Sequence, residues 1–147
     1  MSELNVSDKV TSVRTSTEKV VMIIIGIVLA TIASFIASAV IYALPPVSTL
    51  IAQESRPRPG VPVPAQIGSV VLRSLLTAGL LAGLMVAANW HGTVVGALLG
   101  LSLAILPAVL LFGSVIHEGT AIPVAAIHLT DWIVKLIIIG AAVGLFL

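Results

Sequence analysis

The stretch VVMIIIGIVLATIASFIASAVIYAL, residues 20–44, decides the fold, because none of its 25 residues is charged. A bilayer core of about 30 Å is crossed by about 20 helical residues at about 1.5 Å each. The stretch is also longer than the apolar core of a secretory signal. It is therefore predicted to form a membrane span that is retained in the protein.

The amino-acid composition is typical of a chain that lies mostly in a membrane. Of the 147 residues, 59% are hydrophobic and 9% are charged, against about 45–50% and about 25% in ordinary soluble domains. The mean hydropathy is +1.21. A net charge of +1 does not indicate a nucleic-acid partner, and the absence of cysteine excludes disulfides and thiolate metal sites. We expect one transmembrane domain in the lipid bilayer, with no cofactor.

Three further apolar stretches predict spans at about residues 67–88, 93–116 and 121–146. A polar tail at residues 1–19 precedes the first span, and a Pro-rich segment at residues 45–66 follows it. Because proline cannot continue a helical hydrogen-bond ladder, this segment is predicted to be an extended loop outside the membrane. The sequence therefore predicts an all-α fold, an integral membrane four-helix bundle.

A proline inside the third predicted span is expected to kink it. Pro107 has no N–H group, and its ring clashes with the carbonyl of the residue four positions earlier. Neighbouring helices are expected to satisfy the carbonyl that is freed there, so that the span stays in the membrane.

Positive charges near the first span predict the orientation. Lys9, Arg14 and Lys19 precede this span, and Arg56 and Arg58 lie in the Pro-rich segment on the other side. Positive residues close to a span favour the cytoplasmic side. We expect a multi-pass protein of the cell membrane with both termini in the cytoplasm.

Small residues at four-residue spacing occur in every predicted span. They are Gly26, Ala30, Ser34 and Ser38 in the first, Gly79 and Gly83 in the second, Gly96 and Gly100 in the third, and Gly140 and Gly144 in the fourth. In lipid, apolar contact alone does not drive helix association, whereas small side chains let two backbones approach. We predict that these residues pack the helices together; alternatively, one seam is the face of a homodimer.

The fourth predicted span carries three ionisable residues on one face. His128, Asp131 and Lys135 are spaced i, i+3 and i+7, and Asp131 precedes Lys135 in the favourable orientation for an ion pair. Counted from Ala121, Asp131 lies about 15 Å and Lys135 about 21 Å into the span. An ionised group there costs about 2.5–3.5 kcal/mol, so both are expected to face the bundle interior.

Topology brings further polar residues to this face, because the second and fourth spans start, and the third ends, at the side of the Pro-rich segment. Six residues are candidates for one buried polar cluster: Arg73, His117, Glu118, His128, Asp131 and Lys135. In one interpretation Asp131 and Lys135 form a structural pair, and Arg73 extends to the interface. In another, the cluster binds a ligand or carries protons. A metal site at His117, Glu118 and His128 is a third interpretation, although their spacing is not the HExxH arrangement that places two His on one helical face.

Two stretches of the chain resemble a known family. They are GALLGLSLAILPAVLLFGSVIHEG at residues 96–119 and IHLTDWIVKLIIIGAAVGLF at residues 127–146. They are similar to the bacterial membrane family catalogued as domain of unknown function 1761, with a weaker likeness around Ser34, Ala37 and Tyr42. The resemblance implies a small four-helix bacterial membrane protein, and it implies no activity.

The sequence contains no pattern typical of an enzyme, since it lacks a Gly-rich phosphate loop and a nucleophile elbow. We expect a non-enzymatic protein, most simply a structural or accessory subunit that packs against other membrane subunits. The alternative is a small transporter or ligand-binding protein that uses the buried polar cluster. A cavity that reaches Asp131 would favour this alternative, and a dry, closed bundle would favour the accessory subunit.

Overall fold

The computed structural model describes residues 6–54 and 59–147, and these residues form helices and no strands. The helices are α1 (Val6–Ala43), α2 (Pro45–Glu54), α3 (Val63–Ala87), α4 (Thr93–Leu103), α5 (Ile105–His117) and α6 (Ile122–Leu145). Four stretches are long and apolar enough to cross a membrane: Thr11–Ala43, Val63–Ala87, Thr93–His117 and Ile122–Leu145. The predicted all-α fold, a four-helix membrane bundle, is therefore confirmed, and these four stretches are its candidate spans.

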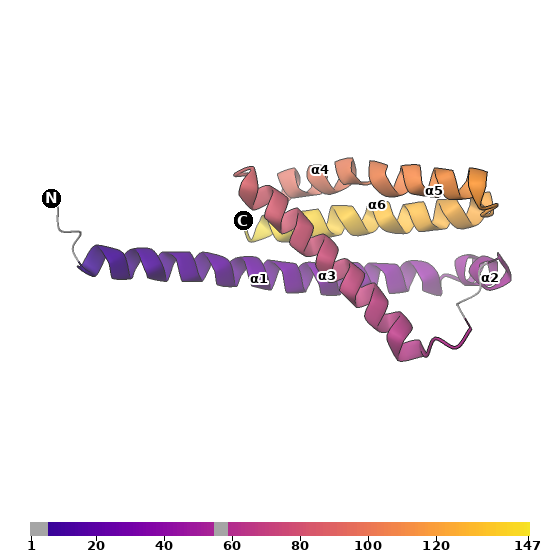
Figure 1. Cartoon of the computed structure of the whole chain (residues 1–147), viewed down its shortest axis with the longest axis horizontal. Coiled ribbons are helices and arrows are strands. Elements are labelled where there is room, and N and C mark those ends of the chain that lie inside the picture. Colours follow the sequence, from indigo (N-terminus) through magenta and orange to yellow (C-terminus); the bar gives the residue numbers. More distant parts are fainter. Residues whose placement is uncertain (1–5, 55–58) are drawn as a thin grey trace.

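The first helix begins well before the apolar stretch that predicted it. α1 includes residues 6–19 of the segment predicted as a polar tail, and residues 1–5 lie outside the described residues. Thr15 and Thr17 donate hydroxyl hydrogen bonds to carbonyls one turn earlier, over 2.9 and 3.0 Å. At about 1.5 Å per residue, α1 is about 57 Å long, so its N-terminal part extends beyond the other helices (Figure 1).

The Pro-rich segment at residues 45–66 differs from the extended loop predicted for it, because its first part is the helix α2. Proline is tolerated in a first helical turn, where its missing N–H would have no partner within the helix. Pro45 accepts hydroxyl hydrogen bonds from Ser48 and Thr49, over 3.1 and 2.8 Å. The prolines therefore end α1 and begin a new helix, which contacts α1 and α6. Residues 55–58, which include both arginines of the segment, lie outside the described residues.

The third span is interrupted at Ala104, close to the predicted kink. Ala104 donates its N–H to Leu101 over 3.1 Å, a tighter turn than in an α-helix. Three residues later, Pro107 has no N–H group to donate to the carbonyl of Leu103. The span therefore consists of α4 and α5, which lie one after the other along α6 (Figure 1).

The last helix is the centre of the bundle. α6 contacts each of the other five described helices, and α3 crosses α1 diagonally (Figure 1). Small and branched apolar side chains fill the core between α1, α3, α4 and α6: Ala30, Ala78, Leu81, Ala82, Met85, Ala104, Leu136, Ile139 and Val143. Functional groups on α6 are therefore surrounded by other helices along most of its length.

The closest helix pair is α4 with α6. A Cβ atom on Gly96 would collide with the carbonyl oxygen of Gly140, and one on Gly100 would collide with that of Leu136. The two backbones therefore touch, which in lipid is a main source of attraction between helices. On α3, by contrast, a Cβ on Gly79 or Gly83 would meet no atom of the described residues within 4 Å. This seam lies at the surface of the single chain.

Candidate functional site

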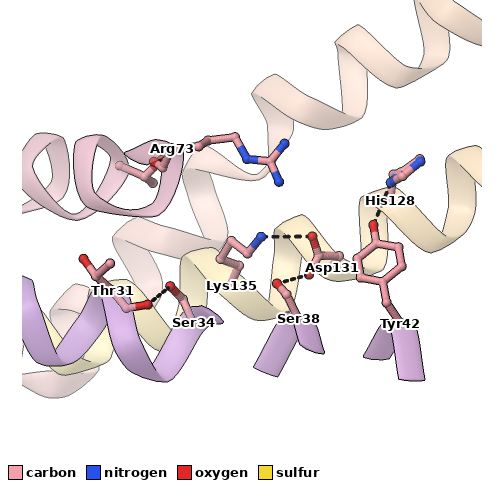
Figure 2. Close-up of polar contacts among 9 residues, drawn as sticks. Thr31, Ser34, Ser38, Tyr42, Arg73, His128, Asp131 and Lys135 are labelled. Carbon is pink, nitrogen blue, oxygen red and sulfur yellow. Dashed lines mark hydrogen bonds and ion pairs between the residues drawn. The ribbon is translucent and has the colours of Figure 1, made fainter. Parts of the chain in front are cut away.

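Two charged side chains of α6 are buried together. Asp131 is 3% exposed and Lys135 is 1% exposed, and Lys135 Nζ donates a hydrogen bond to Asp131 Oδ2 over 3.1 Å. Their i, i+4 spacing places both on one face of α6, and Figure 2 shows them pointing toward each other. Because removing one partner of a buried pair costs about 3–5 kcal/mol, each charge depends on the other.

The first helix supplies further partners for this face. Ser38 Oγ donates to Asp131 Oδ1 over 2.5 Å. One turn later on α1, the hydroxyl of Tyr42 is 2.7 Å from His128 Nδ1 (Figure 2). The helices α1 and α6 run in opposite directions. Ser38 and Tyr42, spaced i, i+4 on α1, therefore face Asp131 and His128, spaced i, i+3 on α6. Because Lys135 donates to Oδ2 and Ser38 to Oδ1, both oxygens of Asp131 have a hydrogen-bond donor.

The third helix brings a second positive charge. The guanidinium carbon of Arg73 is 5.0 Å from the centre of the Trp132 ring, and Lys135 Nζ is 5.7 Å from the same ring. Figure 2 shows Arg73 extending from α3 toward the Lys135–Asp131 pair. A cation over an aromatic face gains about 0.5–2 kcal/mol, less than the cost of about 2.5–3.5 kcal/mol for a charge in the bilayer centre. Stacking on Trp132 alone therefore does not compensate the charge of Arg73.

A cavity of about 300 Å³ lies beside these groups. Its polar lining comes from three helices: Ser38, Tyr42, Arg73, His128, Asp131 and Lys135. Phe35, Ala39 and Val70 form an apolar wall. Small-molecule sites are mostly apolar clefts of about 300–1,000 Å³ with a few placed polar groups. The cavity is at the small end of that range, and its polar content is high.

The structure brings four of the six predicted cluster residues together and places the other two elsewhere. Glu118 lies at the end of α5 and accepts a hydrogen bond from Ser114 Oγ over 2.8 Å, and His117 is exposed there. Glu118 and His128 do line a second pocket, of about 430 Å³, together with Glu54 of α2. His128 therefore borders both pockets. Within the described residues, no group of three or more His, Asp or Glu side chains is arranged to hold a metal ion.

Three residues of the site were not among the predicted cluster. Ser38 was predicted as a packing residue, Tyr42 was named only in the weaker family likeness of the first span, and Trp132 lies within the second stretch that resembles the family. The signal that connects the first two is their four-residue spacing, which continues the small-residue seam of α1 from Ser34. Spacing on one helix does not say which helix it meets, so the partners of Ser38 and Tyr42 required the structure.

The model of a protein family described as "Protein of unknown function (DUF1761)" matches residues 25–144. The matched range contains every residue that lines the cavity. No curated protein and no solved structure matches the chain. Because the family model covers most of the sequence, the chain belongs to this family, as its third and fourth spans indicated.

Proposed function

We propose that this family member is a non-enzymatic membrane protein that binds a small ligand, for transport or sensing, in the cavity between α1, α3 and α6. One observation supports this most strongly: the buried Asp131–Lys135 pair borders a cavity of about 300 Å³. A purely structural pair is best served by close packing around it. Ionisable groups inside a membrane are costly and usually functional, and here Asp131 and Lys135 both belong to the lining of a cavity.

In this proposal the ligand enters the cavity from the side of the second pocket. Its lining includes Glu54, Glu118 and His128, and His128 also lines the main cavity. The ends of α1 and α5 and the start of α6 meet on this side of the bundle, which is the side of the Pro-rich segment. A ligand that enters here passes His128 before it reaches Asp131.

The double variant Asp131→Asn with Lys135→Met tests the proposal. Both charges leave together, so the fold is expected to survive, since replacing a whole buried pair is often neutral. Ligand-dependent behaviour, measured as thermal stabilisation of purified protein or as uptake into vesicles, is expected to disappear. The opposite result, undiminished ligand response in a folded double variant, would show that the pair is structural.

A second candidate is an accessory subunit that packs against other membrane subunits or a second copy. The observation that favours it is the seam of Gly79 and Gly83, where a Cβ would meet no atom of the described residues within 4 Å. Replacing both glycines with leucine would block a helix partner at this seam. Loss of co-purifying subunits, with the Asp131–Lys135 double variant still associating, would favour this candidate.

We place the protein in the cell membrane with both termini in the cytoplasm. Arg14 and Lys19 support this orientation, because positive residues before a span are retained on the cytoplasmic side. The pocket that contains Glu54, Glu118 and His128 then opens on the opposite side of the membrane. No nucleic-acid partner belongs to this proposal, in keeping with the net charge of +1.

A further inference from the structure

The charges around the cavity do not balance. Asp131 accepts hydrogen bonds from Ser38 Oγ at 2.5 Å and from Lys135 Nζ at 3.1 Å, so its negative charge is matched by Lys135. Arg73 also lines the cavity and adds a second positive charge. Among the described residues, no carboxylate lies within ion-pair distance of Arg73. The cavity lining therefore carries an excess of one positive charge.

The hydrogen-bonding groups show the same imbalance. An ammonium group has three N–H donors and a guanidinium has five, and neither has an acceptor. Lys135 uses one donor on Asp131, and the contact described for Arg73 is with the face of Trp132. The donors of Arg73, which is exposed, are therefore available at the cavity, whereas both oxygens of the one lining carboxylate are already engaged. This lining complements a molecule that accepts hydrogen bonds.

The position of Arg73 makes the imbalance important. Arg73 is ten residues into α3, about 15 Å along its axis from Val63, so its backbone lies inside the candidate span Val63–Ala87, and its side chain is exposed. Lys135, the other cation, is 1% exposed and faces the cavity from α6. A charge inside a span is expected to find a partner, and both cations line the same cavity.

We infer that the cavity binds a small oxyanion, a carboxylate or phosphate group, held by the guanidinium of Arg73 and attracted by the positive charge of Lys135 in the cavity lining. The guanidinium fork matches the two oxygens of such a group. Phe35, Ala39 and Val70 accommodate a short hydrocarbon portion of the same molecule. The inference rests on the proposed ligand-binding function and specifies the charge of the ligand. The anion comes either from a soluble metabolite or from the headgroup of an anionic lipid.

The full chain provides its own probe for a test. Trp90 and Trp132 are its two tryptophans, so Trp90→Phe leaves the ring under Arg73 as the single emitter. Protein in zwitterionic-lipid nanodiscs is titrated with butanoate, inorganic phosphate and butylammonium, and emission and thermal midpoint are recorded. Butanoate or phosphate is expected to change both saturably. A second set of nanodiscs contains phosphatidylglycerol, and a response confined to this set assigns the oxyanion to the lipid headgroup.

Two variants locate the response. Arg73→Gln removes the charge and the fork, and it is expected to weaken anion binding at least tenfold, whereas Arg73→Lys weakens it less. Arg14→Gln is the matched control, because Arg14 is exposed on α1 and pairs with Glu18 at 3.2 Å, away from the cavity lining. It is expected to bind as the parent protein does. Equal binding by Arg73→Gln would overturn the inference.

The titrations also separate this inference from the proposed function. A saturable response to butylammonium alone would overturn the oxyanion assignment and leave ligand binding in the cavity standing. Failure of all three probes and of the lipid to change emission or midpoint would overturn the oxyanion assignment and, with it, the proposed ligand binding in the cavity.

Discussion

Asp131 is the residue on which the polar cluster depends. Its two oxygens accept from different helices, Ser38 of α1 and Lys135 of α6 itself. The carboxylate therefore links α1 to α6 inside the bundle. On α3, Ser74 is fully buried, and its hydroxyl has no hydrogen-bond partner among the described residues. Ser38 and Ser74 are both buried, but the hydroxyl of Ser38 donates a hydrogen bond to Asp131, whereas that of Ser74 makes none within the described part of the chain.

Substitution of Ser38 by alanine should therefore be more harmful than the same change at Ser74. Ser38→Ala leaves one oxygen of a buried carboxylate without its donor, which is expected to lower the free energy of unfolding by about 1–3 kcal/mol. Ser74→Ala removes a hydroxyl that is buried without a partner, so the stability is expected to stay unchanged or to rise. Unfolding in mixed detergent micelles measures both. Equal losses would contradict the assigned hydrogen bond.

The sequence predicted part of this cluster. The i, i+4 spacing of Asp131 and Lys135 and their depth were sufficient to expect a buried pair. The contact of Arg73 with Trp132 was not predictable, because both an acidic partner and the membrane interface were within reach of a long side chain. Contacts within one helix can be predicted from the helical period. Contacts between helices depend on the angle and position at which the helices cross, which the sequence does not give.

At the scale of helices, the same GxxxG pattern has two outcomes. Gly96 and Gly100 of α4 lie against the backbone of α6, whereas Gly79 and Gly83 of α3 lie at the surface. α3 crosses the bundle diagonally and makes no contact with α5 in the described part of the chain. A groove of about 530 Å³ between them is lined mainly by leucines and includes Trp132. Spacing alone does not distinguish a packed seam from an open one.

Alanine at two of these glycines should separate the outcomes. In Gly100→Ala the new Cβ collides with the carbonyl oxygen of Leu136, so α4 and α6 must move apart. Overpacking of this kind typically costs about 1–3 kcal/mol, and a loss of this size in unfolding free energy is expected. Gly79→Ala meets open space, so no loss is expected for the single chain. Indistinguishable melting curves for the two variants would contradict the α4–α6 contact.

Helix boundaries were harder to predict than helix existence. Hydropathy located the spans, because about 20 apolar residues have one stable form in lipid. It did not locate residues 6–19 of α1 or the helix α2, where hydroxyl groups of Thr15, Thr17, Ser48 and Thr49 bond to backbone carbonyls of their own helix. These hydrogen bonds are local and polar, and a search for apolar runs does not detect them.

The four candidate spans give the molecule two distinct ends. The N-terminal part of α1 and the turn between α3 and α4 lie at one end, and α2 and the turn before α6 lie at the other. Ser12 is 31 residues before Ala43, the last residue of α1, or about 47 Å at 1.5 Å per residue. This exceeds the bilayer core of about 30 Å. Ser12 and Thr49 are therefore expected on opposite sides of the membrane.

Single cysteines can test this arrangement without background, because the chain has no cysteine of its own. Ser12→Cys and Asn89→Cys place a thiol at one end, and Thr49→Cys places it at the other; all three positions are exposed. A membrane-impermeant maleimide applied to intact cells is expected to label either the first two variants or the third alone. Permeabilised cells should show labelling of all three, which controls for reactivity. If Ser12→Cys and Thr49→Cys react from the same side, α1 does not cross the membrane, and the buried pair of α6 loses the lipid surroundings that make its charges costly.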